Sequence, residues 1–437
     1  MKRIIKTIIV AILTLEAKLV LKKYKPKIIG VTGSVGKTST KDAIYAVLSQ
    51  SLHVRKSEKS FNSEFGVPLT ILGGRNGWND PLLWLETIAR GLLVIILPVR
   101  YPEWLILEIG ADRPGDIKSI CSWVKPDIAV VTRFGDVPVH VEFFKSRKAL
   151  IEEKAYLPKA LKRSGVLILN ADDADVLEFK SHSKGHTITF GMSEEATVSG
   201  SNYAPLYEGA TNESEGNSVA GLSFKANIRG ACFPVIRRGI IGAQHVYPSL
   251  AALAVAVALD LNLVSATEAL SKEPLPPGRM RLIPGIKGSV LIDDTYNSSP
   301  IAVEEGLKAL KDIDIDGRKI AVLGDMLELG KFSAEAHRLV GKQVPKCADI
   351  LVAVGVRAHQ IVEGAHEAGM RKSSMYEFEH SVDAGRFLDA FIQEKDAVFI
   401  KGSQGMRMER IVEEVMAHPE ERAKLLVRQD EEWMKRR

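Results

Sequence analysis

Apolar positions in this chain gather in short runs, and most runs are followed by a stretch in which apolar residues recur with helical spacing. The runs at 27–31, 104–110, 127–135 and 165–173 are rich in Ile, Val and Leu, which is typical of strands buried on both faces. Strands that alternate with helices form parallel sheets covered by helices. The pattern therefore predicts an α/β fold with a mainly parallel sheet.

The pattern changes further along the chain. Between residues 190 and 236, Gly, Ser, Asn and Thr are frequent and helical spacing is absent, which indicates short antiparallel strands. Residues 242–262 are rich in Ala and Leu and predict a long buried helix. We assign residues 25–272 to one central domain, in which a small antiparallel part is added to the parallel sheet.

A second α/β series follows the cluster of three prolines and a glycine in EPLPPGRMR (273–281), which indicates a domain boundary. It contains four apolar runs, SVLIDDTYN, KIAVLGDML, DILVAVGV and DAVFIKGS, and each is followed by helix-like sequence. This series predicts a Rossmann-like C-terminal domain over residues 273–437. The charged tail from Glu413 to Arg437 predicts a solvent-exposed helix.

The first 24 residues are rich in Ile, Leu and Val, but Lys6, Glu16 and Lys18 interrupt them. No stretch of about 18 uncharged apolar residues remains to span a bilayer. We expect residues 1–24 to form an amphipathic helix that packs on the body of the protein. Peripheral contact with a membrane surface, through this helix and the apolar insertion at 73–104, is the open alternative.

Composition narrows the class of protein. The chain has 437 residues, of which 46% are hydrophobic and 26% charged, as in proteins that bury real cores. The net charge of +5 is small and dispersed, so we expect small-molecule substrates, no nucleic acid, and a monomer. Three cysteines without a CxxC pair exclude a disulfide scaffold and a zinc ribbon, and they indicate a reducing, cytoplasmic location.

The strongest motif is a glycine-rich loop between the first strand and the next helix, GVTGSVGKT (30–38). In a P-loop, glycines turn the backbone so that N–H groups point at phosphate oxygens near a helix N-terminus. Lys37 would reach the β- and γ-phosphates, and the Thr38 hydroxyl would bind Mg²⁺. The predicted nucleotide-binding residues of the loop are Gly33, Ser34, Val35, Gly36, Lys37, Thr38 and Ser39.

Three further side chains are candidates. Glu108 ends an apolar strand in LILEIGADRPGD, and a carboxylate at the carboxyl end of a parallel strand suits Mg²⁺, although a solvent-facing acid is the alternative. His140 follows the next strand, where a lone histidine is more often structural. Lys154 lies in helix-like sequence and by itself is typical of a surface lysine.

Together the motifs resemble the Mur ligases, the ATP-dependent amide-forming enzymes of peptidoglycan precursor synthesis. The matching stretches include GVTGSVGKTSTK (30–41), LEIGADRPGDI (107–117), IDDTYNSSP (292–300), VLGDMLELG (322–330) and KGSQGMRME (401–409). The last three are most similar to the branch that joins D-alanyl-D-alanine to a UDP-N-acetylmuramoyl-tripeptide. Through this pathway the resemblance implies a role in cell-wall biogenesis, cell shape and cell division.

The resemblance implies roles for particular residues. ATP would bind at the glycine loop, with one Mg²⁺ on Thr38 and Glu108 and a second on His140 and on Lys154 as a carbamate. Arg279 would reach the ATP phosphates. The positions that match the family's nucleotide contacts further include Gln244, His245, Asp294 and Tyr296. The implied catalytic residues are Lys37, Glu108, His140, Lys154, Asp294 and Asn297.

The implied reaction is transfer of the γ-phosphoryl group to a substrate carboxylate, followed by attack of an amine on the acyl phosphate to give an amide, ADP and phosphate. The family's N-terminal UDP-sugar-binding domain has no counterpart before the glycine loop, where we expect the helix at 1–24 instead. The acceptor is therefore open. A ligase acting on poly-glutamate or a capsule polymer, and a non-catalytic nucleotide-binding regulator of a ligase, are the alternatives.

Overall fold

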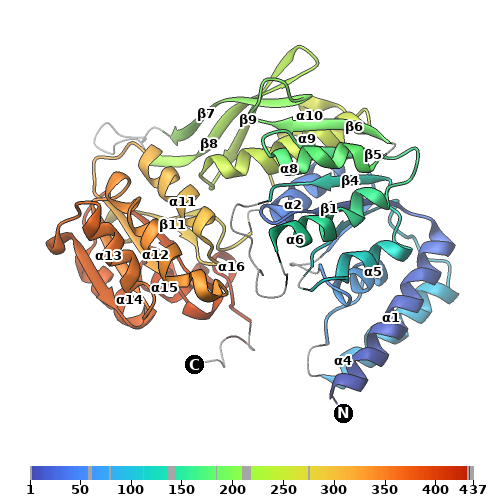
Figure 1. Ribbon diagram of the computed structural model, residues 1–437, viewed down its shortest axis with the longest axis horizontal. Helices are drawn as coiled ribbons and strands as arrows, with labels where there is room; N and C mark the ends of the chain where they lie inside the picture. The colour runs from blue at the N-terminus through green and yellow to red at the C-terminus, as the bar shows by residue number, and fades with distance from the viewer. Residues whose placement is uncertain are drawn as a thin grey trace. The chain divides into compact units, whose positions relative to one another are not determined.

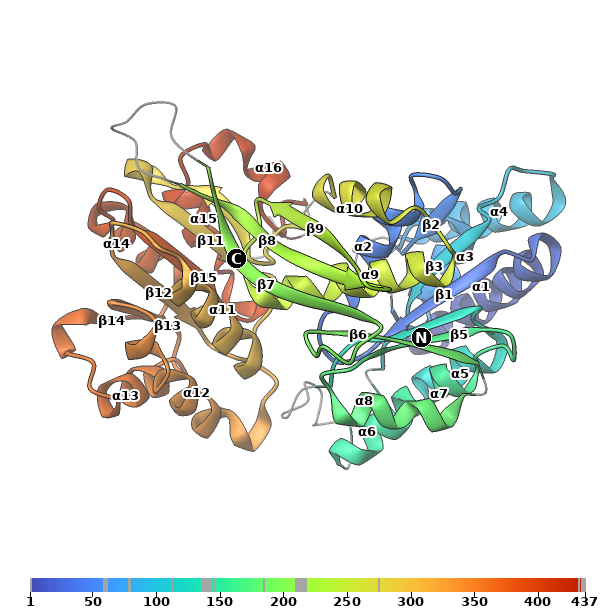
Figure 2. The ribbon, with the colours of Figure 1, turned by 90° about the horizontal axis from the view of Figure 1, so that it is seen from above.

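The computed structural model shows two compact units, drawn as ribbons in Figures 1 and 2. The residues that the structure describes are 2–57, 62–77, 80–111, 113–134, 144, 146–183, 185–208, 218–273, 276–430 and 433. The first unit comprises residues 1–201, 225–235 and 246–273. The second unit comprises residues 202–224, 236–245 and 274–437.

A nine-stranded sheet has the order β2-β3-β1-β4-β5-β6-β7-β8-β9. Its strands are β1 (Lys27–Thr32), β2 (Val54–Lys56), β3 (Trp104–Glu108), β4 (Ile128–Val131), β5 (Val166–Asn170), β6 (His186–Gly191), β7 (Val198–Glu208), β8 (Ser218–Ile228) and β9 (Ala231–Arg238). Neighbouring strands from β2 to β6 pair in parallel, which confirms the predicted parallel sheet. Parallel pairing places the carboxyl ends of β1, β3 and β4 at one edge.

The antiparallel part exists, but the prediction of short strands is wrong, because β7 and β8 each have 11 residues and β9 has 8. In β8 buried positions largely alternate with partly exposed ones, and Ser223 and Asn227 occupy partly exposed positions of this half-buried strand. The hairpin between β8 and β9 turns through Arg229 and Gly230, whose φ angles of 52° and 81° are those of a type I′ turn.

Helices cover the sheet of the first unit (Figure 1). They are α1 (Lys2–Tyr24), α2 (Lys37–Leu48), α3 (Gly66–Leu72), α4 (Pro81–Ile96), α5 (Asp116–Trp123), α6 (Arg147–Lys154), α7 (Tyr156–Lys159), α8 (Ala174–Leu177), α9 (Val246–Ala258) and α10 (Leu263–Ser271), with the 3₁₀ turn η2 (Glu178–His182). Helix α9 is buried along almost its whole length and packs on α2, as predicted for the Ala-rich segment.

Helix α1 packs against α3 and α4. Leu13, Ala17 and Val20 are fully buried in the core of the first unit, so one face of α1 belongs to that core. Helix α4 forms within the apolar insertion and begins at Pro81, where the Asp80 carboxylate accepts from the Leu82 and Leu83 N–H groups as an N-cap. Among the described residues, no helix has both the length and the hydropathy needed to cross a bilayer.

The second unit contains a six-stranded sheet with the order β10-β11-β15-β12-β13-β14. Its strands are β10 (Arg281–Pro284), β11 (Val290–Asp294), β12 (Lys319–Gly324), β13 (Ile350–Val354), β14 (Met375–Phe378) and β15 (Ala397–Lys401). Its helices are α11 (Pro300–Asp312), α12 (Ser333–Gly341), α13 (His359–Glu367), α14 (Ser381–Phe391), α15 (Glu409–Val415) and α16 (Arg422–Leu425). All pairs except β10–β11 are parallel, which confirms the Rossmann-like prediction.

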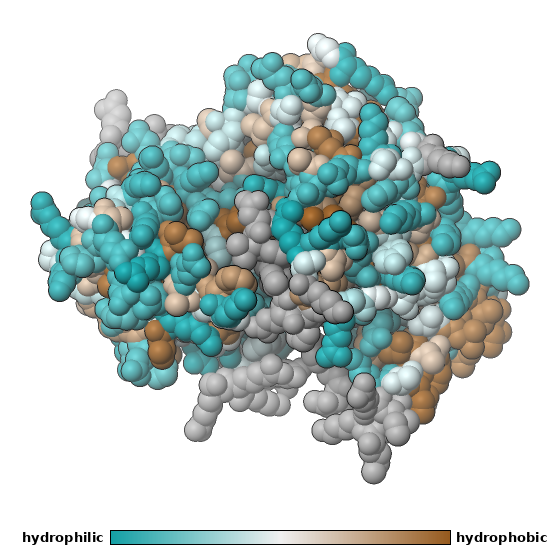
Figure 3. Space-filling model, viewed as in Figure 1, coloured by the Kyte–Doolittle hydropathy of each residue, from teal (hydrophilic) through white to brown (hydrophobic). Residues whose placement is uncertain are grey.

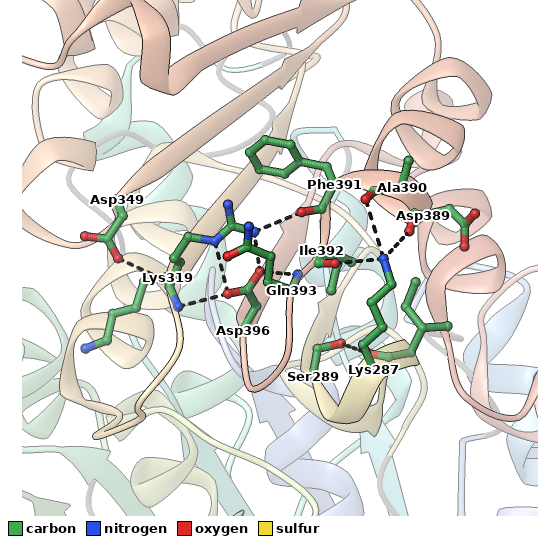
Figure 4. Close-up of polar contacts among 12 residues, drawn as sticks. Lys287, Ser289, Lys319, Asp349, Asp389, Ala390, Phe391, Ile392, Gln393 and Asp396 are labelled. Carbon is green, nitrogen blue, oxygen red and sulfur yellow. Dashed lines mark hydrogen bonds and ion pairs between the residues drawn. The ribbon is translucent and has the colours of Figure 1, made fainter.

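Polar contacts hold the end of α14 against this sheet (Figure 4). Lys287 Nζ donates to the carbonyl oxygens of Asp389 at 3.0 Å and Ile392 at 2.9 Å. A cation at a helix C-terminus satisfies carbonyls that lack helical partners and interacts favourably with the helix dipole. Asp396, before β15, accepts from the Arg318 guanidinium at 2.7 Å, which joins the starts of β12 and β15.

The predicted solvent-exposed helix over residues 413–437 is wrong. In the described part of the tail, α15 ends at Val415, α16 has four residues, and no helix follows between 426 and 430. Leu425 and Leu426 belong to the hydrophobic core of the second unit. The apolar run in this charged tail is therefore buried at the end of the short helix α16 and does not lie on a solvent-exposed helix.

Candidate active site

The glycine loop connects β1 to α2, as the motif predicts. Gly33 has a φ of 143°, and a Cβ at this position would lie 1.9 Å from the Thr132 hydroxyl oxygen, so only glycine fits here. The Ser34 and Val35 N–H groups donate to the Arg133 carbonyl oxygen at 2.8 and 3.2 Å. These two amides brace the loop against the end of β4, and α2 begins directly after the loop, where the N-terminus of a helix favours an anion.

The predicted phosphate-binding side chains begin α2. Lys37 is the first residue of the helix, and its Nζ lies 3.3 Å from the Ser34 carbonyl oxygen, so the side chain folds back over the loop. Thr38 follows in the same turn. Gly36, with a φ of 81°, supplies the left-handed conformation from which the helix starts.

Glu108 ends β3 at the same edge of the sheet, and its backbone pairs with Val31 of β1. The side chain is 1% exposed. Its Oε1 accepts from Asn62 Nδ2 at 3.4 Å, whereas no described residue forms a hydrogen bond with Oε2. A buried carboxylate oxygen in this state has unused capacity to bind a cation.

Lys41 lies one helical turn after Lys37 and was not predicted as a site residue. It is 1% exposed, donates to the Ser57 carbonyl oxygen at 2.9 Å, and places Nζ 3.8 Å from Glu108 Oε2. The sequence could have indicated that Lys41 is buried, because it lies on the same helical face as the apolar residues Ile44 and Leu48. Its charge compensates part of the buried charge of Glu108.

Lys154 ends α6 and is 3% exposed, so it is a buried residue and not the surface lysine that its local sequence indicates. Its Nζ donates to the Gly33 carbonyl oxygen at 2.9 Å, which brings it to the glycine loop. The preceding residue, Glu153, fixes this helix in place. Its carboxylate accepts from the N–H groups of Gly115 and Ile117, at 2.9 and 2.8 Å, at the N-terminus of α5.

The residues of the first unit fit Mg²⁺ at the edge formed by β1 and β3. The donor set is oxygen, from the Thr38 hydroxyl and the buried Glu108 carboxylate, which are the hard ligands that this ion prefers. The Oε2 atom without a hydrogen-bond partner among the described residues is the observation that supports the fit. The remaining predicted ligand, His140, lies outside the described residues.

In the second unit, Asp294 and Lys401 form the central ion pair. The two residues lie side by side at the ends of the parallel strands β11 and β15, and Lys401 Nζ is 2.6 Å from Asp294 Oδ2. The same ammonium donates to the Asn297 carbonyl oxygen at 2.8 Å. Lys401 is 3% exposed and was not predicted, although it opens the KGSQGMRME motif.

Arg279 and Tyr296 also lie together in this unit. The Arg279 guanidinium carbon is 4.3 Å from the centre of the Tyr296 ring, a cation–π contact. The loop that carries Tyr296 is held by Arg428, whose guanidinium donates to the carbonyl oxygens of Thr295, at 3.0 Å, and of Tyr296. Arg428, which was not predicted, also pairs with the buried Glu409 carboxylate at 2.9 Å.

Asp293 precedes this ion pair and is fully buried. Burial raises the pKa of its carboxyl to about 6, although hydrogen bonds from Thr295 and from the Gly278 N–H oppose the shift. The Thr295 hydroxyl donates at 2.6 Å and the Gly278 N–H at 3.0 Å. Asp293 thereby ties the backbone next to Arg279 to the end of β11.

Gln244 and His245 lie in the 3₁₀ turn η3 (Ala243–His245). Burial lowers the pKa of His245 to about 3, with smaller contributions from Arg237 and Arg279, so the imidazole is neutral at physiological pH. Gln244 is half-buried beside it. A neutral imidazole and an amide can each donate and accept hydrogen bonds, as recognition of a nucleotide base requires.

The loop after β12, which carries the GDMLELG motif, is fixed by two side chains. Asp325 Oδ1 accepts from the Ala358 N–H at 2.7 Å, and the Met326 N–H donates to His337 Nε2 at 2.9 Å. Because Nε2 accepts, we assign the proton to His337 Nδ1, which lies 2.6 Å from the Ser333 carbonyl oxygen. Burial lowers the pKa of His337, in agreement with this neutral form.

Comparisons with known proteins cover both units. A Mur ligase middle domain matches residues 31–256, and a Mur ligase glutamate ligase domain matches residues 278–404. The UDP-N-acetylmuramoyl-tripeptide–D-alanyl-D-alanine ligase of Bacillus subtilis is 28% identical over 404 residues, which cover 92% of this chain and 79% of that protein. The ligase of the same name from Mycobacterium leprae is 30% identical over 398 residues, covering 87% of this chain and 71% of that protein.

Solved structures show the same similarity. The MurF ligase of Thermotoga maritima, determined in complex with ADP, superposes with a TM-score of 0.75 at 26% sequence identity. The superposition covers 95% of this chain and 85% of that one. The fold of this chain is thus shared with that ligase over nearly the whole of this chain.

Proposed function

This chain belongs to the Mur ligase family, and on that premise we propose that it joins D-alanyl-D-alanine to a UDP-N-acetylmuramoyl-tripeptide. It is an ATP-dependent, ADP-forming ligase. The two substrates are those in the names of the Bacillus subtilis and Mycobacterium leprae relatives. The sequence motifs of the second unit that resemble this branch support the same choice.

One observation carries the proposal. The buried Glu108 carboxylate lies at the carboxyl edge of β1 and β3, next to the glycine loop, with Oε2 lacking a hydrogen-bond partner among the described residues. A phosphate loop and an available carboxylate oxygen at one sheet edge form the arrangement that phosphoryl transfer requires. Thr38 and Glu108 would hold Mg²⁺ here. When bound, the ion supplies positive charge that offsets repulsion between phosphate oxygens and the substrate carboxylate.

The protein's own groups orient ATP. The first turn of α2 would donate backbone N–H groups to phosphate oxygens, and Lys37 would direct its ammonium to the β- and γ-phosphates. Lys41 and Lys154, both buried, hold Glu108 and the Gly33 carbonyl in position. A loop braced in this way would hold bound phosphates in a fixed position for attack by the substrate carboxylate.

We assign the second unit to substrate and nucleotide contacts. Arg279 and Tyr296 would contact the phosphates and the ribose or base, and Gln244 and His245 would hydrogen-bond the adenine. Asp294, fixed by Lys401, would accept from the incoming amine and orient it toward the acyl phosphate. Asn297 would donate to a substrate oxygen through its side-chain amide.

We further propose that Lys154 is carbamylated and, with His140, holds a second Mg²⁺. Carbon dioxide adds to the neutral lysine amine, forming a C–N bond and releasing one proton, and the product offers anionic oxygen ligands. Replacement of Lys154 by Arg tests the idea, because guanidinium keeps the charge and the hydrogen bond to Gly33 but does not form the carbamate. We expect K154R to lose activity as fully as K154A, and full activity of K154R would refute the carbamate.

The substrate assignment is tested by phosphate release. The protein is incubated with ATP, Mg²⁺, the UDP-muramoyl-tripeptide and D-alanyl-D-alanine, with Lys37→Met as the inactive control. We expect release that requires both the tripeptide and the dipeptide. Phosphate release only with a poly-glutamate or capsule acceptor would show that the ligase acts on another substrate. Nucleotide binding without phosphate release with any acceptor would show that the protein is a non-catalytic regulator. We place this activity in the cytoplasm and expect a monomer by light scattering.

A further inference from the structure

Exposed apolar side chains are concentrated on two helices of the first unit. Of the 17 large hydrophobic residues that are exposed in the described chain, 10 lie in α1, in α4 and in the three residues after α4. We call them the α1–α4 apolar face. It consists of Ile8, Leu15, Leu19, Leu82, Leu85, Leu92, Leu93, Ile96, Leu97 and Val99. Figure 3 shows hydrophobic surface at the lower right, beside the place of α1 and α4 in Figure 1.

The apolar face is distinct from the core. On α1, Ile8, Leu15 and Leu19 recur at spacings of seven and four residues, which place them on one side of the helix. The buried residues Leu13 and Val20 point to another side and belong to the core. The exposed side of α1 is therefore a second apolar stripe that folding of this unit does not use. A continuous patch of this kind on a soluble surface marks an interaction site.

The two helices form one platform. Lys23 Nζ donates to the carbonyl oxygens of Ile95 at 2.8 Å and Leu97 at 2.6 Å, at the C-terminus of α4. Earlier in the pair, Gly91 lies so close to Glu16 that a Cβ on the glycine would be 2.2 Å from the carboxylate oxygen. Close approach and capping hold α1 and α4 side by side, as the views in Figures 1 and 2 also show.

Positive charge is concentrated on the α1 side of this platform. Residues 1–27 contain eight Lys and Arg residues and a single acidic residue, Glu16, which is buried. Residues 1–27 therefore carry a net charge of +7, whereas the whole chain carries +5. The rest of the protein thus has a net charge of −2, from +5 minus +7. Lys18 and Lys22 are exposed on the solvent side of α1, whereas the exposed Arg90 on α4 is offset by the exposed Glu86, so the positive charge lies along α1. The complementary partner is a surface that is both apolar and negatively charged.

We propose that the α1–α4 apolar face docks on an anionic phospholipid membrane, with both helices lying in the interfacial region. Amphipathic helices with apolar residues on one face and lysines at its border bind such surfaces through apolar insertion and attraction to acidic headgroups. The phosphate loop and the Asp294–Lys401 pair do not belong to this face. The attachment therefore holds the ligase at a bilayer without using its catalytic groups.

Sedimentation with vesicles tests the proposal on the full-length protein. Wild-type protein is mixed with vesicles of phosphatidylcholine alone or with about 30% phosphatidylglycerol, and we expect binding mainly to the anionic vesicles, weakened by salt. The test variant carries Leu85→Ser, Leu92→Ser and Ile96→Ser. The matched control carries Val264→Ser and Val356→Ser, which replace exposed apolar residues elsewhere. We expect the test variant to lose about tenfold or more in partitioning and the control to match wild type.

A charge variant, Lys18→Glu with Lys22→Glu, distinguishes electrostatic attraction to acidic headgroups from apolar insertion. We expect it to weaken binding to anionic vesicles only. Phosphate release and thermal unfolding verify that every variant is folded. Absence of wild-type binding to both kinds of vesicle would overturn the proposal, as would a test variant that binds like the control. The proposal would also be overturned if the wild-type protein were a dimer that does not bind vesicles and the test variant were a monomer. That result would show that the α1–α4 apolar face is an interface between two copies of the chain.

Discussion

Glu16 offers a direct test of how α1 and α4 are held together. Its side chain is 4% exposed between these helices, and neither carboxylate oxygen has a hydrogen-bond partner among the described residues. A buried carboxylate without a partner favours its neutral form, because burial penalises the charge. Burial raises the pKa of Glu16 from 4.5 to about 7. The first unit therefore carries a proton near neutral pH that its unfolded chain does not.

The sign of the effect follows from proton uptake. The unfolded chain loses this proton above about pH 4.5, and the folded unit keeps it to about pH 7. Between these values unfolding releases a proton, so the free energy of unfolding falls as pH rises, and it stops falling above about pH 7. At about 1.4 kcal/mol per pH unit, the interval from pH 4.5 to about 7 allows a fall of at most about 3.5 kcal/mol, and relaxation of the surroundings around the charged carboxylate lowers our expectation to about 1 to 3 kcal/mol.

Glu16→Leu removes the titrating group and fills similar space with apolar atoms. We expect the variant to be more stable than wild type by about 1 to 3 kcal/mol at pH 8 and nearly equal to it at pH 4.5. Glu86→Gln, which replaces an exposed carboxylate on α4, is the control and should keep the pH dependence of wild type. Urea unfolding followed by tryptophan fluorescence reports on this unit, because Trp84, Trp104 and Trp123 lie in it.

Two results would refute this reasoning. The first is a Glu16→Leu variant that is less stable than wild type at pH 8, which would mean that the carboxylate has a stabilising partner. The second is a stability difference between variant and wild type that does not change between pH 4.5 and pH 8. Either result would show that Glu16 is not the buried, unpartnered acid that the structure describes.

Three further predictions concern the site. Gly33→Ala should abolish binding of a fluorescent ADP analogue, because its Cβ would lie 1.9 Å from the Thr132 hydroxyl oxygen, and retention of binding would show that the loop is not held as described. Lys401→Met should lower kcat by about 100-fold or more, because Asp294 loses its ion pair, whereas the affinity for ATP measured by calorimetry should change little. Arg428→Ala should raise KM more than it lowers kcat, because the loop at Thr295 and Tyr296 loses two hydrogen bonds, and Arg428→Lys should restore part of the loss.

The architecture was predictable because strand and helix periods are local properties. The glycine loop lies between β1 and α2, and Glu108 ends β3, as the motif and the apolar run predict. The site residues that were missed depend on distant parts of the chain. The pairing of β15 with β11 brings Lys401 to Asp294. Lys41 is recognised as a site residue only when the packing of α2 on the sheet is known. A lysine on an apolar helix face is the one local signal that could have identified Lys41.

The errors have a related origin. The charged tail predicted an exposed helix, whereas Leu425 and Leu426 enter the core, because two apolar residues in a charged segment can be buried without helical periodicity. The strands β7 and β8 were predicted to be short, because Gly, Ser and Asn within them are also typical of turns and so indicated breaks where the strands continue. In both cases burial was decided by tertiary contacts that no window of the sequence contains.

The order of strands in the second unit has a consequence for biosynthesis. β15 is the last strand of this sheet to be made, yet it lies between β11 and β12, so a growing chain cannot close the sheet until residues 397–401 have left the ribosome. Domains made earlier fold first, and the glycine loop is complete long before this point. The strand that closes the sheet also delivers Lys401 to Asp294. Until β15 is made, a growing chain has a complete phosphate loop but lacks the Asp294–Lys401 pair, so the second unit gains this pair only when its sheet closes.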